Sequence, residues 1–278
     1  MKKLSLFLAA VMSLGTIAMT TACGEAEETI YVDTNAYFAP FEYYDADGAI
    51  QGVDIEIMNK VGEKLGKKVK FENTDFGVII DNVSSGKKYD CGAAGITVTD
   101  ARKEKVDFSD TYFKSVQYVI YKGDDMDFDG TATDGTDYIL WSSLAGKKIG
   151  VQLDTTGHIY VDGEINATED NDEYGYDGAI YGTGAECVTF DNAQLATDAI
   201  GVSVDVVVVD ELPANYIVAK NENLHCYALY YDNETATEEE YAICVTKGNT
   251  ELLNAINEVL KELGKEGINA LVKKHLGL

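Results

Sequence analysis

Strand-like and helix-like segments alternate along the chain, and this alternation limits the fold more than any other feature. After TIYVDT, which is typical of a strand, residues 53–66 place apolar side chains at helical spacing and end at Gly66. Residues 67–74 resemble a strand, 77–86 a helix and 89–97 a buried apolar strand. This β-α-β-α-β order predicts an α/β protein with a layered sheet.

A second series of strands and helices begins at residue 147, and its four consecutive valines, 206–209, predict a buried parallel strand. Two extended segments, near 118–122 and 238–242, would join the series to the first unit. The chain therefore crosses twice and returns, ending in two helices that we expect to separate at Gly267. We predict one lobe from residues 29–119 and 242–278, a second lobe from 120–241, and a ligand cleft between them.

The first 22 residues have the pattern of an export sequence. Two lysines precede the apolar stretch LSLFLAAVMSLGTIAM, which ends in the small residues TTA before Cys23. Cys23 resembles the lipidated cysteine of a bacterial lipoprotein, so residues 1–22 are predicted to be a signal peptide and 23–28 a tether. Plain secretion after cleavage near Ala22 is the alternative. Either way, the protein would act outside the cytoplasm.

The chain carries 48 acidic and 22 basic residues, a formal net charge of −26. Such a charge argues against binding nucleic acid or an anionic membrane surface electrostatically. Because 46% of the residues are hydrophobic, the chain can nevertheless bury a substantial core.

Arg102 is the only arginine of the chain, and it follows Thr99 and Asp100, which are favoured at helix starts. A cation in the first turn is unfavourable for the helix itself, but backbone N–H groups and a guanidinium together can bind a carboxylate. A surface salt bridge to one of the many acids is the simpler alternative.

Two segments of the second unit offer complementary groups. Thr156 and Gly157 lie at a predicted helix start, where hydroxyl and amide groups can face the same anion. Asp210 follows the valine strand, at the edge where open α/β sheets bind ligands, and its carboxylate could hold an ammonium group. An ordinary turn and a helix cap are the respective alternatives. Together with Arg102, these residues describe a site for an α-amino acid that needs no catalytic group.

The chain resembles the bacterial extracellular solute-binding proteins of family 3, the polar amino acid-binding proteins of ABC importers, many of which are lipoproteins. The resemblance rests on segments in the family's order, among them YDCGAAGITVTDARKEKVDFSDTYF, LAGKKIGVQLDTTG and DVVVVDELPAN. It covers most of residues 29–278. It implies a two-lobe fold of the periplasmic-binding-protein type II, a free amino acid as ligand, an ABC permease as partner, a monomer without cofactor, and no enzymatic activity.

The resemblance also assigns roles to individual residues. Arg102 would clamp the ligand carboxylate with Thr97 and the amides near Thr156 and Gly157, while Gly95 and Asp210 would hold the amino group. The ligand side chain would lie between Phe38 and Phe76, for which a core role is the alternative. The full predicted ligand-binding set is Asn35, Phe38, Phe76, Gly95, Thr97, Arg102, Thr156, Gly157 and Asp210.

Asn35 bears on the ligand class, because relatives that favour cationic ligands often have aspartate at this position. Neither Asn35 nor Leu153 offers a second basic contact for an acidic ligand. We therefore expect an uncharged side chain: glutamine, another neutral amino acid or cystine.

The chain departs from the family pattern in three places. Asp154 replaces the glycine that usually precedes the threonine pair, and residues 124–137 and 162–187 form acidic insertions. In the first insertion Asp125, Asp127 and Asp129 match the opening of a calcium loop, although Thr136 stands where the bidentate glutamate belongs. A solvated acidic linker is the alternative to a metal site.

Three questions stay open from the sequence. Cys91, Cys187, Cys226 and Cys244 could form disulfides or remain buried thiols. An extracellular sensor is one alternative to a transport receptor. A dehydratase-like enzyme on the same fold is another, with Glu42 or Asp33 as conceivable acids near the cleft.

Overall fold

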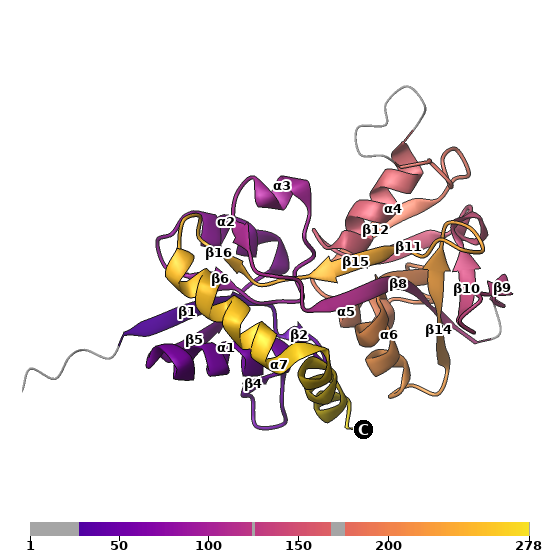
Figure 1. Cartoon of the computed structure of the whole chain (residues 1–278). Coiled ribbons are helices and arrows are strands. Elements are labelled where there is room, and N and C mark those ends of the chain that lie inside the picture. Colours follow the sequence, from indigo (N-terminus) through magenta and orange to yellow (C-terminus); the bar gives the residue numbers. More distant parts are fainter. Residues whose placement is uncertain (1–27, 124–125, 168–175, 278) are drawn as a thin grey trace, which may run out of the picture.

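The computed structural model describes residues 28–123, 126–167 and 176–277, which form two α/β lobes (Figure 1). The first lobe is built on a five-stranded sheet in the order β5-β1-β6-β16-β7, and a short hairpin sheet, β2-β3-β4, lies beside it. Its elements are β1 (Thr29–Thr34), β2 (Tyr37–Phe38), β3 (Glu42–Tyr44), β4 (Ile50–Gln51), α1 (Val53–Leu65), β5 (Lys68–Asn73), η1 (Phe76–Val78), α2 (Ile79–Ser84), β6 (Cys91–Gly92), α3 (Asp100–Lys103), β7 (Asp107–Phe108), β16 (Cys244–Val245) and α7 (Thr250–Leu276).

The second lobe contains an eight-stranded sheet. Its main path runs β12-β11-β13-β8-β14-β10-β9, and β15 pairs with β8 off this path. Its elements are β8 (Phe113–Lys122), β9 (Gly130–Thr131), β10 (Asp137–Leu140), η2 (Trp141–Leu144), β11 (Lys148–Gln152), α4 (Thr156–Asn166), β12 (Glu186–Phe190), α5 (Ala193–Asp198), β13 (Val206–Asp210), α6 (Glu211–Val218), β14 (Leu224–Tyr230) and β15 (Glu238–Tyr241).

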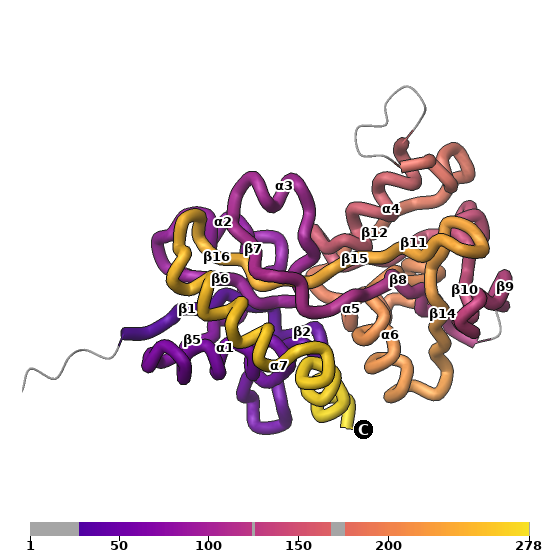
Figure 2. Tube along the Cα trace, in the orientation of Figure 1, coloured from indigo at the N-terminus to yellow at the C-terminus, as the bar shows by residue number. Residues whose placement is uncertain are grey.

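The two lobes are joined by β8 and β15, which run antiparallel with Phe113 opposite Tyr241 and Val116 opposite Glu238. Figure 2 shows both strands passing between the lobes, and α7 returning to the first lobe after the second crossing. The predicted lobe boundary at 119/120 therefore falls inside β8, and the boundary at 241/242 falls at the end of β15.

Local sequence patterns explain the first lobe well. In α1, the apolar positions Ile57, Met58 and Val61 are fully buried, and the helix packs against α7. Gly66 ends α1 in the left-handed region with φ 66°, as its position in the sequence predicts.

One detail differs from the sequence-based expectation. The C-terminal helices are separated at Gly264, whose φ of 57° and ψ of −178° break the helical conformation, whereas Gly267 lies in a helical segment. In the second insertion, residues 162–166 continue α4 and 186–187 belong to β12.

Candidate functional site

Arg102 lies in α3, whose first turn faces the second lobe. Thr99 is the N-cap, and its hydroxyl accepts a hydrogen bond from the Arg102 N–H at 3.2 Å. The residue is only 9% exposed. Nη1 donates to the Thr97 carbonyl at 2.8 Å, and Nη2 donates across the cleft to the Asp154 carbonyl at 3.0 Å. Its partners are thus backbone carbonyls rather than the carboxylate of a surface salt bridge.

Phe76 covers the guanidinium, with its ring centroid 5.4 Å from Cζ. Burial lowers the pKa of Arg102, while the negative charges of Glu239 and Asp210 oppose this change. A desolvated guanidinium on an aromatic ring, with nearby acids but no paired carboxylate, is suited to bind an anionic group from a ligand.

Asp154 adopts the left-handed conformation, with φ 62°. It stands at the position where the family pattern considered in the sequence analysis usually has glycine. Aspartate tolerates this region better than most residues. The conformation allows the Asp154 carbonyl to contact Arg102, and the Asp154 side chain lies against Gly77 of the other lobe. A Cβ on Gly77 would lie 2.2 Å from Asp154 Oδ2, so a larger residue there would displace the Asp154 side chain.

The start of α4 contributes the second half of the predicted carboxylate clamp. Thr155 is its N-cap, and the buried Thr156 donates to the Thr97 hydroxyl at 2.7 Å, which links the lobes directly. Gly157 is closely surrounded, because a Cβ there would lie 2.8 Å from Gln117 Oε1. Thr97 and Thr156, two residues of the predicted clamp, are therefore in contact between the lobes, and Gly157 follows Thr156 in the chain.

Asp210 ends β13 and is buried. It occupies the N-cap position of α6 but makes no side-chain capping bond. Instead, Oδ1 accepts from Gln117 Nε2 at 2.8 Å, and Oδ2 accepts from the Tyr241 hydroxyl. The Asp210 carboxylate thus bonds to Gln117 and Tyr241 rather than to the backbone of α6, which argues against a simple capping role.

Gly95 and Phe38 lie together on the first-lobe side. Gly95 has φ 53°, and a Cβ on it would lie 2.9 Å from the Phe38 ring. Its N–H donates to Asp54 Oδ2 at 3.0 Å, which fixes the peptide. Phe38 is buried and packs near Phe41 and Tyr241, so it belongs to the hydrophobic core, the alternative to its predicted ligand contact.

Asn35 connects the lobes at another point of the cleft. Its Nδ2 donates to the Thr74 carbonyl at 2.7 Å, and its Oδ1 accepts from Gln152 Nε2 at 3.0 Å. Gln152 is 4% exposed, and its Oε1 has no hydrogen-bond partner within the described residues. Leu153, the neighbour considered from the sequence, is instead 45% exposed.

Four buried polar residues of the site, Gln117, Glu239, Gln152 and Asp54, were not predicted from the sequence. Gln117 lies on β8, Gln152 on β11 and Glu239 on β15, whereas Asp54 lies in the first turn of α1. Glu239 could have been found from the run of glutamates at 238–240, because a strand directs alternate side chains to opposite faces. The others had no local signature.

Glu42 and Asp54 form a second group of buried carboxyls. Burial raises the pKa of Asp54 to about 6, although the Tyr112 hydroxyl and the Gly95 N–H lower it. Burial and the charges of Asp54 and Asp210 raise the pKa of Glu42 well above its ordinary value. Both Glu42 carboxyl oxygens lack a hydrogen-bond partner in the described part of the chain.

Replacing Glu42 by methionine should stabilise the protein increasingly as pH rises. The folded state holds the Glu42 proton above the pH at which the unfolded chain loses it, so this carboxyl makes stability fall as pH rises from its ordinary pKa of 4.5. Glu42→Met removes that loss, and we expect a gain of about 1–3 kcal/mol near pH 8. Urea unfolding at several pH values measures it, with the exposed Glu63→Met as control. A loss of stability independent of pH would contradict this account.

A cavity of about 910 Å³ lies between α3 and α4, beside β15. Figure 1 shows these two helices on either side of β15. Thr97, Thr156 and Glu239 line the cavity, whereas Arg102 and Asp210 do not, because contacts between the lobes bury them.

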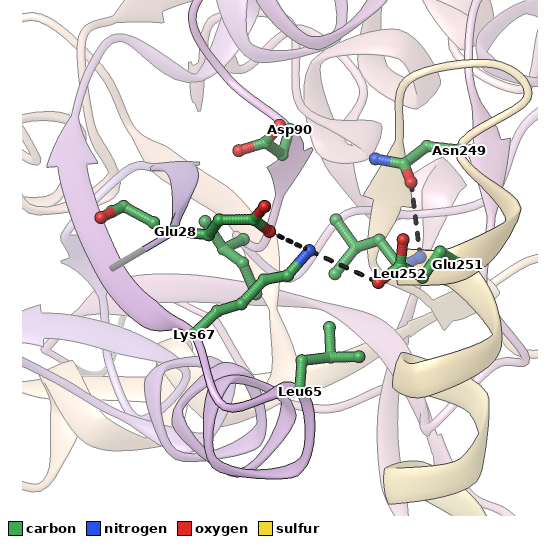
Figure 3. A pocket seen from close by; sticks show the side chains of 9 residues that line it. Glu28, Leu65, Lys67, Asp90, Asn249, Glu251 and Leu252 are labelled. Atoms are coloured by element: carbon green, nitrogen blue, oxygen red, sulfur yellow. Dashed lines mark hydrogen bonds and ion pairs between the residues drawn. The ribbon is translucent and has the colours of Figure 1, made fainter. Parts of the chain in front are cut away.

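A smaller cavity of about 270 Å³ lies at the outer face of the first lobe (Figure 3). Lys67 extends across it and forms ion pairs with Glu28 at 2.9 Å and Glu251 at 3.4 Å. Because its cation is already paired with two acids, this pocket is a poor carboxylate site, and the cleft remains the candidate.

The remaining predictions from the sequence concern metal, cysteines and the N-terminus. Asp125 and residues 1–27 lie outside the described residues. Asp129 Oδ2 accepts from the Leu140 N–H at 2.8 Å and from Ser143 Oγ at 2.6 Å, and the described residues contain no group of three or more His, Cys, Asp or Glu placed to hold a metal. The free cysteines are Cys91, Cys187, Cys226 and Cys244.

Within residues 28–123, 126–167 and 176–277, no helix combines the length and apolarity that crossing a bilayer requires.

Comparison with known proteins extends this picture. The family model described as "Bacterial extracellular solute-binding proteins, family 3" matches residues 30–278. The L-cystine-binding protein TcyJ of Escherichia coli K12 is 26% identical over 275 residues, covering 97% of this chain and 91% of the relative.

Two solved structures are similar over most of their length. One is an ancestral arginine-binding protein bound to glutamine, with TM-score 0.71, 32% identity, and coverage of 91% of this chain and 99% of that one. The other is the ancestral amino acid-binding protein AncCDT-1, titled a precursor of cyclohexadienyl dehydratase, with TM-score 0.70, 28% identity, and coverage of 89% and 95%. The predicted two-lobe α/β fold is confirmed.

Proposed function

Because this chain belongs to the bacterial extracellular solute-binding proteins of family 3, we propose that it captures a free amino acid outside the cytoplasm and delivers it to an ABC importer. The observation that carries the proposal is that Arg102 and Asp210 are both buried between the lobes, close enough for the charge of Asp210 to affect the pKa of Arg102. One buried guanidinium and one buried carboxylate match the two charges of an α-amino acid.

The contacts between the lobes indicate how binding would proceed. A ligand carboxylate would replace the Asp154 carbonyl on Arg102 Nη2 and accept from Thr97 or Thr156. Since the ligand would then contact both lobes, it would stabilise the closed arrangement by hinge motion about β8 and β15.

The side-chain amides of Asn35 and Gln152, which bond to each other, support an uncharged ligand side chain. The buried Gln152 Oε1 has no partner among the described residues, and a donor on the ligand would satisfy it. A side-chain amide supplies such a donor, so glutamine is the leading candidate. Cystine and other neutral amino acids remain in the proposed class.

The test is calorimetric titration of the protein, freed of carried-over ligand by unfolding and refolding, with each common amino acid and cystine. Saturable binding of one or a few neutral amino acids supports the proposal. Binding of cationic or acidic amino acids alone would overturn the ligand class, and binding of none would overturn the function.

Asn35→Asp should shift selectivity towards cationic amino acids. The new carboxylate would lie in the buried contact with Gln152, where an ion pair with a ligand ammonium or guanidinium is strong. We expect affinity for arginine or lysine to rise about 10- to 100-fold relative to glutamine. Parallel calorimetric titrations measure the ratio, and the exposed Asn59→Asp, which adds the same charge to the same lobe, should leave it unchanged. An unaltered ratio in Asn35→Asp would place the ligand side chain elsewhere.

We further propose that the mature protein is a monomer held at the membrane by a lipid on Cys23. The basis is the small-residue sequence before Cys23 and the acidic tether that follows it. Metabolic labelling with a fatty acid, abolished by Cys23→Ser, would support the anchor.

An enzymatic role is the alternative that one observation favours. Glu239 in the cleft has a raised pKa, as a general acid requires, and AncCDT-1 is titled a precursor of a dehydratase. Product analysis after incubation with cyclohexadienyl substrates separates the two functions, since a receptor returns its ligand unchanged.

A further inference from the structure

Glu239 lies beside Asp210, although the two residues come from different elements. On β15, Glu238 is exposed and Glu239 is buried, as strand alternation requires. Gln117 Nε2 donates to Glu239 Oε1 at 2.5 Å and to Asp210 Oδ1 at 2.8 Å. One amide nitrogen therefore holds the two carboxyl groups side by side.

The second oxygen of each carboxyl contacts a different part of the site. Glu239 Oε2 accepts from the Thr97 hydroxyl at 2.5 Å, and Thr97 in turn accepts from Thr156 of the second lobe. Asp210 Oδ2 accepts from Tyr241. The pair thus connects the first lobe, the joining strands and the second lobe at the point where the ligand ammonium is expected.

The surroundings do not neutralise two negative charges. Arg102 of α3 is a buried cation that interacts electrostatically with the pair, and two of its N–H donors are engaged with backbone carbonyls. Tyr241 on β15, Tyr160 on α4 and Glu42 on β3 also interact with the pair, and Glu42 adds a further acid. The other charged or titratable residues that line the same cavity as Glu239 are Asp100, Lys103, Asp154, His158, Asp162, Tyr176, Glu238 and Glu240.

Two adjacent buried carboxyls cannot both remain ionised, so they share a proton. Consistent with this, burial and the charge of Asp210 raise the pKa of Glu239 well above its ordinary value. Burial likewise raises the pKa of Asp210, although Tyr241 and Gln117 lower it.

We propose that Glu239 and Asp210 form a single ammonium-binding pair that exchanges its shared proton for the ammonium group of the ligand, so that each capture event releases a proton to solvent. This inference rests on the proposed function. The bound ammonium supplies the positive charge that the proton supplied before, and Gln117 holds the two carboxyls in place throughout.

The exchange determines the sign of the pH dependence. The ligand-bound protein binds fewer protons than the free protein, so affinity rises with pH while the free pair holds its proton. The slope approaches a tenfold gain per pH unit when one full proton is released. Acidification would therefore promote ligand release.

Calorimetry with L-glutamine in pairs of buffers of different ionisation enthalpy counts the released protons. From about pH 5 to about pH 8, we expect the wild-type protein to release up to one proton per ligand. Glu239→Gln, which keeps the shape but removes the shared site, should release almost none and show a flat pH profile. Glu238→Gln removes an exposed charge from the same strand and should match the wild type. Equal release in Glu239→Gln and wild type, or none in the wild type, would overturn the proposal.

A measurement without ligand separates this inference from the proposed function. In protein labelled with ¹³C-glutamate and ¹³C-aspartate, the carboxyl resonances of Glu239 and Asp210, assigned by their loss in Glu239→Gln and Asp210→Asn, should together report one bound proton at neutral pH. If both carboxyls were ionised, the shared proton would be overturned whether or not any amino acid binds. A protonated Glu239 in a protein that binds no amino acid would support the shared proton but overturn the proposed function, and with it the exchange.

Discussion

Arg102→Ala should greatly weaken amino acid binding. It removes the buried guanidinium expected to hold the ligand carboxylate, and leaving a carboxylate unpaired in a closed cleft costs about 2–5 kcal/mol. That corresponds to a loss of affinity from about 30-fold to several thousand-fold. Calorimetric titration with the best ligand measures the loss.

Two further variants define what Arg102 contributes. Arg102→Lys should restore little, because an ammonium group lacks the two-pronged geometry of the guanidinium. Lys103→Ala removes an adjacent, exposed cation that pairs with Asp100, and should bind as the wild type does. Thermal unfolding of each variant verifies that it is folded. A folded Arg102→Ala with wild-type affinity would show that the carboxylate binds elsewhere.

Asp210→Asn should remove most of the preference for the amino group. The change keeps the side-chain shape but eliminates the charge that pairs with the ligand ammonium, and we expect an affinity loss of about 2–5 kcal/mol. The sharper measurement compares an amino acid with the same acid lacking its α-amino group. In the wild type the amino acid should bind far more tightly, and in Asp210→Asn the difference should largely disappear.

The exposed Asp191→Asn serves as the control for charge, since it removes one carboxylate from the same lobe without altering the cleft. If Asp210→Asn lowered the affinities of the amino acid and its deaminated analogue equally, Asp210 would act by shaping the cleft rather than by binding the ammonium. That result would also overturn the exchange of the shared proton for the ligand ammonium.

Residues of the candidate site differ in how far the sequence could predict them. The position of Arg102 could be predicted because Thr99 and Asp100 place it in the first turn of a helix, and Thr99 is indeed the N-cap. The role of Asp154 could not be predicted, because its left-handed backbone and its carbonyl contact with Arg102 depend on the approach of the other lobe.

Glu239 shows the same limit. Strand alternation indicates that one glutamate of the run 238–240 points inward. Glu239 is nevertheless linked to Asp210 only through Gln117, which lies 122 positions from Glu239 in the chain. Its raised pKa follows from that meeting and from burial, neither of which has a local pattern.

By itself, the sequence determined the alternation of strands and helices, the helix starts at Thr99 and Thr155, and the export pattern before Cys23. These follow from side-chain periodicity, capping and composition, which act over a few residues. Only the tertiary structure decided which polar groups meet across the cleft, where Asn35 contacts Gln152 and Glu239 lies beside Asp210. The reason is that packing two lobes against one another brings distant segments together, and burial there changes both hydrogen bonding and charge.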